Sequence, residues 1–227
     1  MRVPSTPSPP FNAPAARRLR EALGMAPGHV AYGLQAQYGI HVAPDIVVAW
    51  ERGTLAPASH ELTALAGVLW CAPGDLLGAA RSLREHRIAR AIDPEELARL
   101  VGMEASAYRT MEDTDRWRGS ERQTAALAEA LALSPRELLT ATGRNEEFAE
   151  LLRSAVTTRW QAYVRPVARV LAVPRRQVES ALRQMHADYQ ARMVTTSSWG
   201  ASGGSGEAGK EYLERVVDHF WELAPGR

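Results

Sequence analysis

The chain has 227 residues, of which 45% are hydrophobic and 23% charged, and this composition is typical of a folded globular protein. The formal net charge is +1, and no apolar run of about 18 residues indicates a membrane span. The single cysteine, Cys71, excludes an internal disulfide and a cysteine-based zinc site, and the histidines lack metal-binding spacing. We therefore expect a cytoplasmic protein with no metal, no other cofactor and no membrane partner. Lys210 is the only lysine among 27 basic residues, a bias that indicates a GC-rich bacterial genome.

The N-terminal residues 1–14 are rich in Pro and Ser and lack the apolar core of a signal peptide, so we expect a disordered arm there. Beyond them, apolar residues recur every three or four positions, which predicts amphipathic helices. The pattern of residues 63–77 returns at 125–139, with a shared Ala-Leu-Ala, a later Leu, a Pro and a closing Leu-Leu. The sequence therefore predicts an all-α fold with two copies of one helical unit, at 15–80 and 81–144.

Two stretches within these units resemble a known family. EELARLVGMEASAYRTME in the second unit and AWERGTLAP in the first are similar to the Cro/repressor-type (XRE) helix-turn-helix family, in which a Leu-Ala pair and a Gly precede a recognition helix that ends in Glu. The resemblance covers roughly residues 15–142. It implies a transcriptional regulator, with no enzymatic activity, that binds double-stranded DNA as a homodimer in the nucleoid.

The resemblance also implies one ion pair in each unit, because in this family an Arg of the first helix pairs with the Glu that ends the third. The corresponding residues are Arg20 with Glu51, and Arg87 with Glu112. Such pairs would hold the third helix against the first, and unrelated surface charges are the alternative. The first interval is six residues longer than the second, which predicts a longer second helix and a larger turn in AYGLQAQYGIHVAP.

The residues expected to face DNA differ between the units. In the first unit the family pattern exposes Pro44, Asp45, Val48 and Ala49, and His41 and Arg52 could contact the duplex beside them. In the second unit it exposes Ala105, Ser106, Arg109 and Thr110. Only Arg109 suits bidentate readout of guanine, and the acidic run at 112–115 would repel phosphate. An adaptor that keeps the fold and binds another protein through its apolar third helix is therefore the alternative function.

The segment 145–194 carries the main excess of positive charge, with eight Arg and five acidic residues over 145–200. Its pattern predicts helices broken at Pro166 and Pro174. ARVLAVPRRQVESALR within it is similar to a generic helix-turn-helix, with Arg175, Arg176 and Gln177 facing outward as a third DNA-binding element. A helical pair for dimerisation is the alternative for this segment, and we favour it because short patterns of this kind arise often by chance.

The C-terminal part divides into a Gly/Ser-rich stretch at 195–209, which predicts a flexible linker, and a docking helix at 210–227. This helix is too short to be stable alone, so it must dock on its own chain or on a partner. We expect it to form the dimer interface through its apolar stripe, which comprises Tyr212, Val216, Val217 and Phe220.

Four tryptophans lead to separate expectations. Trp50, which precedes the Glu that ends the third helix, and Trp70 are expected in the core. A pocket near Trp160, Tyr163 and Trp199 could accept a small-molecule effector, although no residue pattern identifies one.

Overall fold

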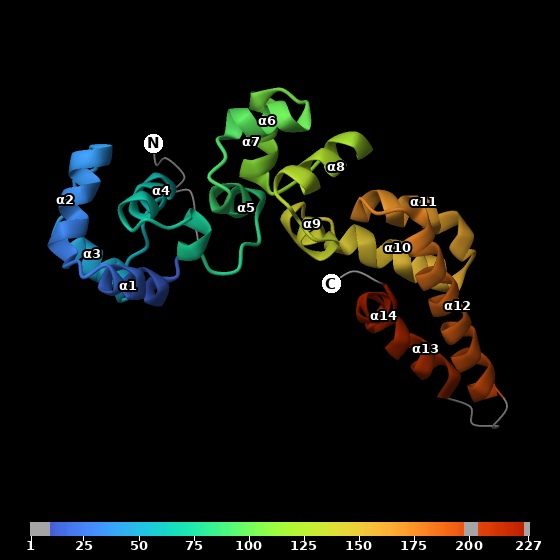
Figure 1. Cartoon of the computed structure of the whole chain (residues 1–227). Coiled ribbons are helices and arrows are strands. Elements are labelled where there is room, and N and C mark those ends of the chain that lie inside the picture. Colours follow the sequence, from blue (N-terminus) through green and yellow to red (C-terminus); the bar gives the residue numbers. More distant parts are fainter. Residues whose placement is uncertain (1–9, 198–203, 225–227) are drawn as a thin grey trace, which may run out of the picture. The chain divides into compact units, whose positions relative to one another are not determined.

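The computed structural model of the chain describes residues 10–197 and 204–224 (Figure 1). Within these residues the protein is all-α, as the sequence predicts, with fourteen α-helices, one 3₁₀-helix and no strand. The chain divides into two compact units, residues 1–112 and 113–227, so that the division falls inside the predicted second repeat. The boundary lies in the last turn of the helix Ala105–Thr114, most of which belongs to the first unit.

The first unit opens with a helix that begins earlier than the sequence suggests. The Asn12 side chain caps α1 by accepting a hydrogen bond from the Ala15 backbone amide at 3.1 Å. The Asn12 backbone amide donates to the Leu76 carbonyl at 2.8 Å. Residues 10–14, assigned above to a disordered arm, are therefore ordered, whereas residues 1–9 lie outside the described residues. The helices of this unit are α1 (Ala13–Ala22), α2 (Pro27–Tyr38), α3 (Pro44–Glu51), α4 (Ser59–Val68), η1 (Pro73–Leu76), α5 (Leu83–Ala89), α6 (Pro94–Val101) and α7 (Ala105–Thr114).

The extra length of the first repeat lies where the spacing predicts it. Helix α2 has 12 residues and its counterpart α6 has 8, a difference of about one helical turn. Both end at a glycine in the left-handed region, Gly39 and Gly102, where a side chain would be strained. The turn between α2 and α3 is also longer than the turn between α6 and α7.

The core of α1–α4 is closed by large apolar residues of α2, α3 and α4, and α1 contributes the small buried side chain of Ala16. Leu34, Val47 and Leu62 are buried, and so is Trp50, as expected. The expectation for Trp70 is wrong, because its side chain is 87% exposed. Trp70 has φ 55° at the end of α4, where the chain reverses, and the reversal directs its side chain away from the core.

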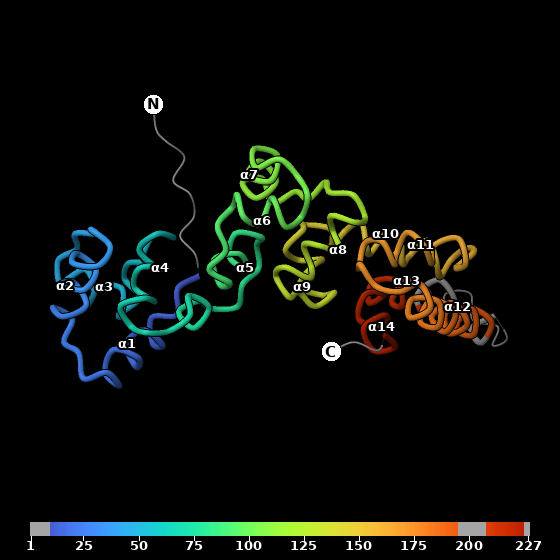
Figure 2. The backbone as a smooth tube through the Cα atoms, turned by 45° about the horizontal axis from the view of Figure 1, so that its top comes forward, coloured from blue at the N-terminus to red at the C-terminus, as the bar shows by residue number. Residues whose placement is uncertain are grey.

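The second unit consists of α8 (Glu121–Ala130), α9 (Pro135–Ala141), α10 (Asn145–Thr157), α11 (Trp160–Leu171), α12 (Arg175–Ser197), α13 (Gly204–Glu214) and α14 (Val216–Leu223). Helices α10, α11 and α12 pack together, and Figures 1 and 2 show α13 running beside α12. Pro166 lies inside α11 and does not break it, contrary to the sequence expectation. The described ends of the predicted linker are helical, since α12 extends to Ser197 and α13 begins at Gly204.

Several helices of both units end in the same way, although their sequences differ. The first or second residue after the helix takes a left-handed conformation, and the next amide donates to a carbonyl in the last turn. Ala91, Ala132 and Ala172 have φ of 54°, 48° and 54° at these positions. Because alanine is less stable than glycine in this region, each of these chain reversals carries a local conformational cost that the packing around it offsets.

Candidate nucleic-acid interface

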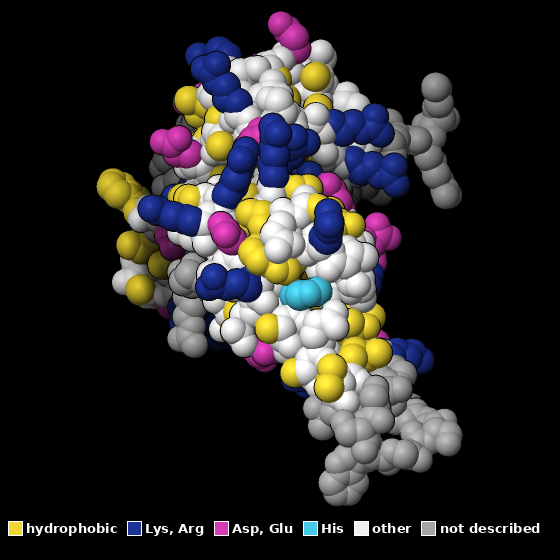
Figure 3. Space-filling view, turned by 90° about the vertical axis from the view of Figure 1, so that its right-hand side faces the viewer, with side chains coloured by type: hydrophobic (Ala, Val, Ile, Leu, Met, Phe, Trp, Pro, Cys, Tyr) yellow, Lys and Arg dark blue, Asp and Glu magenta, His cyan; other side chains and the backbone are white. Residues whose placement is uncertain are grey.

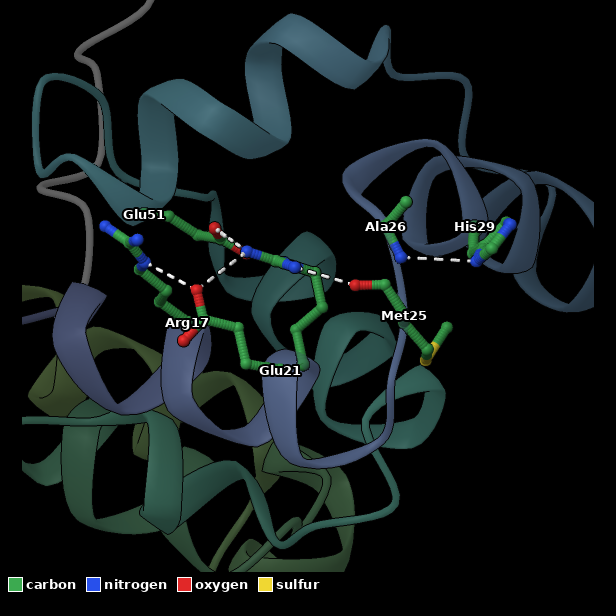
Figure 4. A network of polar contacts seen from close by, with 7 residues as sticks. Arg17, Glu21, Met25, Ala26, His29 and Glu51 are labelled. Carbon is green, nitrogen blue, oxygen red and sulfur yellow. Dashed lines mark hydrogen bonds and ion pairs between the residues drawn. The ribbon is translucent and has the colours of Figure 1, made fainter.

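The third helix of the first repeat, α3, is held against α1 by a bidentate ion pair. Arg20 donates from Nε to Glu51 Oε1 at 2.6 Å and from Nη2 to Oε2 at 2.8 Å, and its Nη1 donates to the Met25 carbonyl at 2.7 Å (Figure 4). The hydrogen bond that Arg20 donates to Glu51 raises the pKa of Arg20 above its ordinary value. The guanidinium thus joins the end of α3 to both α1 and the chain that leads into α2.

The second repeat contains the corresponding pair with one additional cation. Arg87 donates from Nε to Glu112 Oε2 and from Nη2 to Oε1, both at 2.8 Å, and from Nη1 to the Ile92 carbonyl at 2.9 Å. Arg84 adds a contact of 3.1 Å to Glu112 Oε1. Arg84 and Arg87 are three residues apart and therefore share a face of α5, a signal that the sequence interpretation overlooked.

The carboxylate of Glu112 remains ionised despite its burial, with only 5% of the side chain exposed. Burial raises its pKa, but the hydrogen bonds and the charge of Arg87 outweigh burial and hold the pKa below its ordinary value. Beside the pair lies the fully buried Tyr108. Burial raises the pKa of Tyr108 far above its ordinary value, so this phenol remains neutral.

The outer face of α3 offers little for reading bases. Pro44 and Asp45 are exposed on its first turn, while Val48 and Ala49 are half-buried. The flanking candidates His41 and Arg52 are also exposed, before and after the helix. The described surface of α3 therefore presents one carboxylate and several apolar groups, with its nearest cation at the C-cap.

The outer face of α7 carries polar side chains, but the principal one is already paired. Ser106, Arg109 and Thr110 are all exposed, and Ala105 before them is half-buried. Arg109 forms an ion pair with Glu95 of α6, and the Thr110 hydroxyl donates to the Ser106 carbonyl at 2.9 Å. The sequence interpretation did not anticipate Glu95, whose only visible signal was its place in the helix start of α6. Any contact of Arg109 with a base must first break this surface pair.

The start of α12 places two of its three predicted readers in solvent. Arg175 and Arg176 are exposed, whereas Gln177 is half-buried, which corrects the expectation that it faces outward. Gln177 lines a small apolar pocket together with Leu171, Val173, Val178, Pro135, Phe220, Trp221 and Ala224. This pocket differs from the one expected near Trp160 and Tyr163, both of which pack partly on the core. Trp199 lies outside the described residues.

The apolar stripe of the tail is buried within its own chain. Tyr212, Val216 and Phe220 are each 1% exposed, and Val217 packs against the same core. The Tyr212 hydroxyl donates to the Met185 carbonyl of α12 at 3.2 Å, and the Phe220 ring contacts the Phe148 ring edge-on at 5.1 Å. The assignment of these four residues to a dimer interface is therefore wrong, because the side chains that it requires are occupied by α10 and α12.

The described residues contain no cluster of three or more His, Cys, Asp or Glu side chains that could hold a metal ion. No helix within residues 10–197 and 204–224 is long and apolar enough to cross a membrane. No protein-family model matches the chain, and no curated protein or solved structure matches it either.

Proposed function

We propose that the protein is a sequence-specific transcriptional regulator that binds duplex DNA as a homodimer in the bacterial nucleoid. The observation that carries the proposal is the repeated clamp between a first and a third helix. In each repeat a buried carboxylate at or near the end of the third helix accepts bidentate hydrogen bonds from an arginine of the first helix. This arrangement fixes α3 and α7 by their C-terminal ends and leaves their first turns exposed, as entry into a major groove requires.

Homodimerisation belongs to the proposal because one recognition helix contacts only a few base pairs. Two copies related by a two-fold axis double that contact and read an inverted repeat. Light scattering on the purified full-length protein tests this part, with a mass of about twice the 24.9 kDa chain expected. A monomer that stays monomeric on its binding site would contradict it.

The experiment for DNA binding is a pull-down of fragmented genomic DNA with the full-length protein at two salt concentrations. A few discrete inverted-repeat sites are expected at both concentrations. If the protein engages about six phosphates, its affinity should fall roughly 10³-fold between 50 and 200 mM salt. Recovery of no DNA, or of all fragments at low salt only, would contradict sequence-specific binding. Arg52→Ala and Arg109→Ala test the individual sites, and the assignment to α3 and α7 fails if neither weakens binding.

The alternative function is a protein-interaction adaptor, and a specific observation favours it for the first repeat. The outer face of α3 carries Asp45 and apolar groups in place of bidentate readers, and elsewhere in the same unit Tyr32 and Trp70 are largely exposed. Exposed aromatic side chains are typical of surfaces that bind protein. Binding of a protein to this unit should persist at high salt, in contrast to binding of DNA.

A further inference from the structure

The most basic surface among the described residues lies on α11 and α12. Residues 159–187 contain six Arg and a single acidic residue, Glu179, whereas the rest of the chain has 21 basic and 25 acidic residues. All six arginines are exposed: Arg159, Arg165, Arg169, Arg175, Arg176 and Arg183. In Figure 3, which faces this end of the molecule, several Lys and Arg side chains lie next to one another. A local net charge of +5 in a chain of net charge +1 indicates an anionic partner at this surface.

The two helices that carry these arginines form a helix-turn-helix with a rigid turn. Ala172 ends α11 in the left-handed conformation, and the Val173 amide donates to the Ala168 carbonyl at 3.1 Å. Val173 packs against the core, and Pro174 precedes the first turn of α12. A turn of three residues with a half-buried centre fixes the direction in which α12 leaves α11.

The arginines occupy the outer faces of both helices. On α12 the buried residues Val178 and Leu182 face α10 and α11, while Arg176 and Arg183 lie on the opposite side with Ser180 between them. On α11, Arg165 and Arg169 are four residues apart and so share one exposed stripe. The packing of the inner faces thus directs the charges of α11 and α12 outward.

Most of these cations are available for a partner. Arg165, Arg175, Arg176 and Arg183 form no ion pair with any described residue. The contact of Arg169 with Glu121 is long, at 3.7 Å, and both side chains are about half exposed. The α12 surface differs in this respect from α7, where the only bidentate reader is paired with an acid.

We propose that α12 is the principal recognition helix of the protein, with Arg175 and Arg176 reading guanine in the major groove of duplex DNA. Arg165, Arg169 and Arg183 would contact phosphates of the same duplex. The proposal rests on the proposed function and names the helix and the base by which that function is carried out. Guanine is the base because its N7 and O6 accept a bidentate pair of hydrogen bonds from one guanidinium.

The form of the nucleic acid follows from the aromatic residues of this unit. Single strands are bound by stacking of bases on exposed aromatic rings. Trp160 and Tyr163 on α11 are half-buried against the core and provide no such platform. A rigid helix flanked by phosphate contacts fits a duplex groove instead, because the major groove admits an α-helix.

The test compares two double variants of the full-length protein with the same change in charge. Arg175→Gln/Arg176→Gln removes the proposed readers, and Arg18→Gln/Arg99→Gln removes two exposed arginines of α1 and α6 that belong to no proposed contact. Affinity is measured by fluorescence anisotropy on the duplexes recovered from genomic DNA, and circular dichroism verifies folding. The reader variant should bind at least about tenfold more weakly for each arginine, and the control no more than about threefold more weakly.

A base substitution in the same duplexes provides a second measurement. Replacing the guanines by 7-deazaguanine removes the N7 acceptor. This change should weaken binding by the wild-type protein about tenfold and leave the affinity of the reader variant unchanged. Equal losses in the reader and control variants, or tighter binding of single-stranded RNA than of duplex DNA, would overturn the proposal. Loss of binding in the Arg52→Ala or Arg109→Ala variants alone would overturn it while leaving the proposed function intact. Absence of any duplex binding by the wild type would refute both.

Discussion

Removal of the carboxylate charge at Glu112 should loosen the second repeat more than any comparable change at the surface. In Glu112→Gln the side chain keeps its volume but loses the charge that accepts three hydrogen bonds, at 2.8, 2.8 and 3.1 Å, from Arg87 and Arg84. Arg87 is then left with little exposure to water, since 12% of its side chain is accessible, and with the Ile92 carbonyl and the amide oxygen of Gln as uncharged acceptors. Breaking a buried pair from one side costs about 3–5 kcal/mol, and the retained amide oxygen of Gln places our expectation at the lower end, about 3 kcal/mol.

The assay is urea denaturation of the full-length protein, combined with hydrogen exchange of the α7 amides, which reports on the repeat that contains the pair. Glu150→Gln is the matched control, because Glu150 is exposed on α10, and it should change stability by less than about 0.5 kcal/mol. If Glu112→Gln destabilises the protein no more than the control does, the pair does not hold α7 and the reasoning is refuted.

The contribution of Glu112 should also depend on pH in a definite direction. Its pKa in the folded protein lies below the ordinary value of 4.5, so the unfolded chain takes up the proton first as the pH falls. The stability that the carboxylate supplies is therefore fully present at neutral pH and is lost as the pH falls through the folded pKa. Urea denaturation should show that wild type and Glu112→Gln differ less in their free energy of unfolding in acid, below about pH 4.5, than at neutral pH.

Three further predictions concern a chain reversal, the α7 surface and the tail. Ala172→Gly should raise stability by about 0.5–1 kcal/mol in thermal melting because glycine tolerates φ 54°. The control Ala187→Gly, in the exposed middle of α12, should lower stability by a similar amount, and the same sign for both variants would contradict the prediction. Glu95→Gln should release Arg109 and tighten duplex binding about two- to fivefold in anisotropy at low salt, and an unchanged affinity would exclude Arg109 as a DNA contact. Phe220→Ala should cost about 3–5 kcal/mol in urea denaturation because the ring is buried in its own chain, while light scattering should show an unchanged mass per particle; dissociation of a stable dimer instead would restore the tail as an interface.

Local patterns in the sequence determined the features that depend on neighbours along the chain. The three- to four-residue period of apolar side chains is sufficient to predict an all-α protein, because the helix itself sets that period. The extra residues between Arg20 and Glu51 predicted a longer α2, since a helix grows by a fixed rise per residue. The ion pairs were suggested by a family resemblance, and the structure contains both of them because their spacing brings the end of the third helix back to the first.

Tertiary structure decided which surfaces remained available. The sequence shows that Phe220 must be covered, but its stripe suits its own chain and a partner equally well, and only the packing on α10 and α12 settles the choice. Arg109 and Arg176 look alike as candidate readers, yet one is paired with Glu95 and the other is free of any described ion pair. Trp70 belongs to a residue type that is usually buried, but its own backbone is left-handed and directs the side chain into solvent. In each case the deciding contact joins residues that no local period relates, because burial and pairing depend on distances that exist only once the helices have packed.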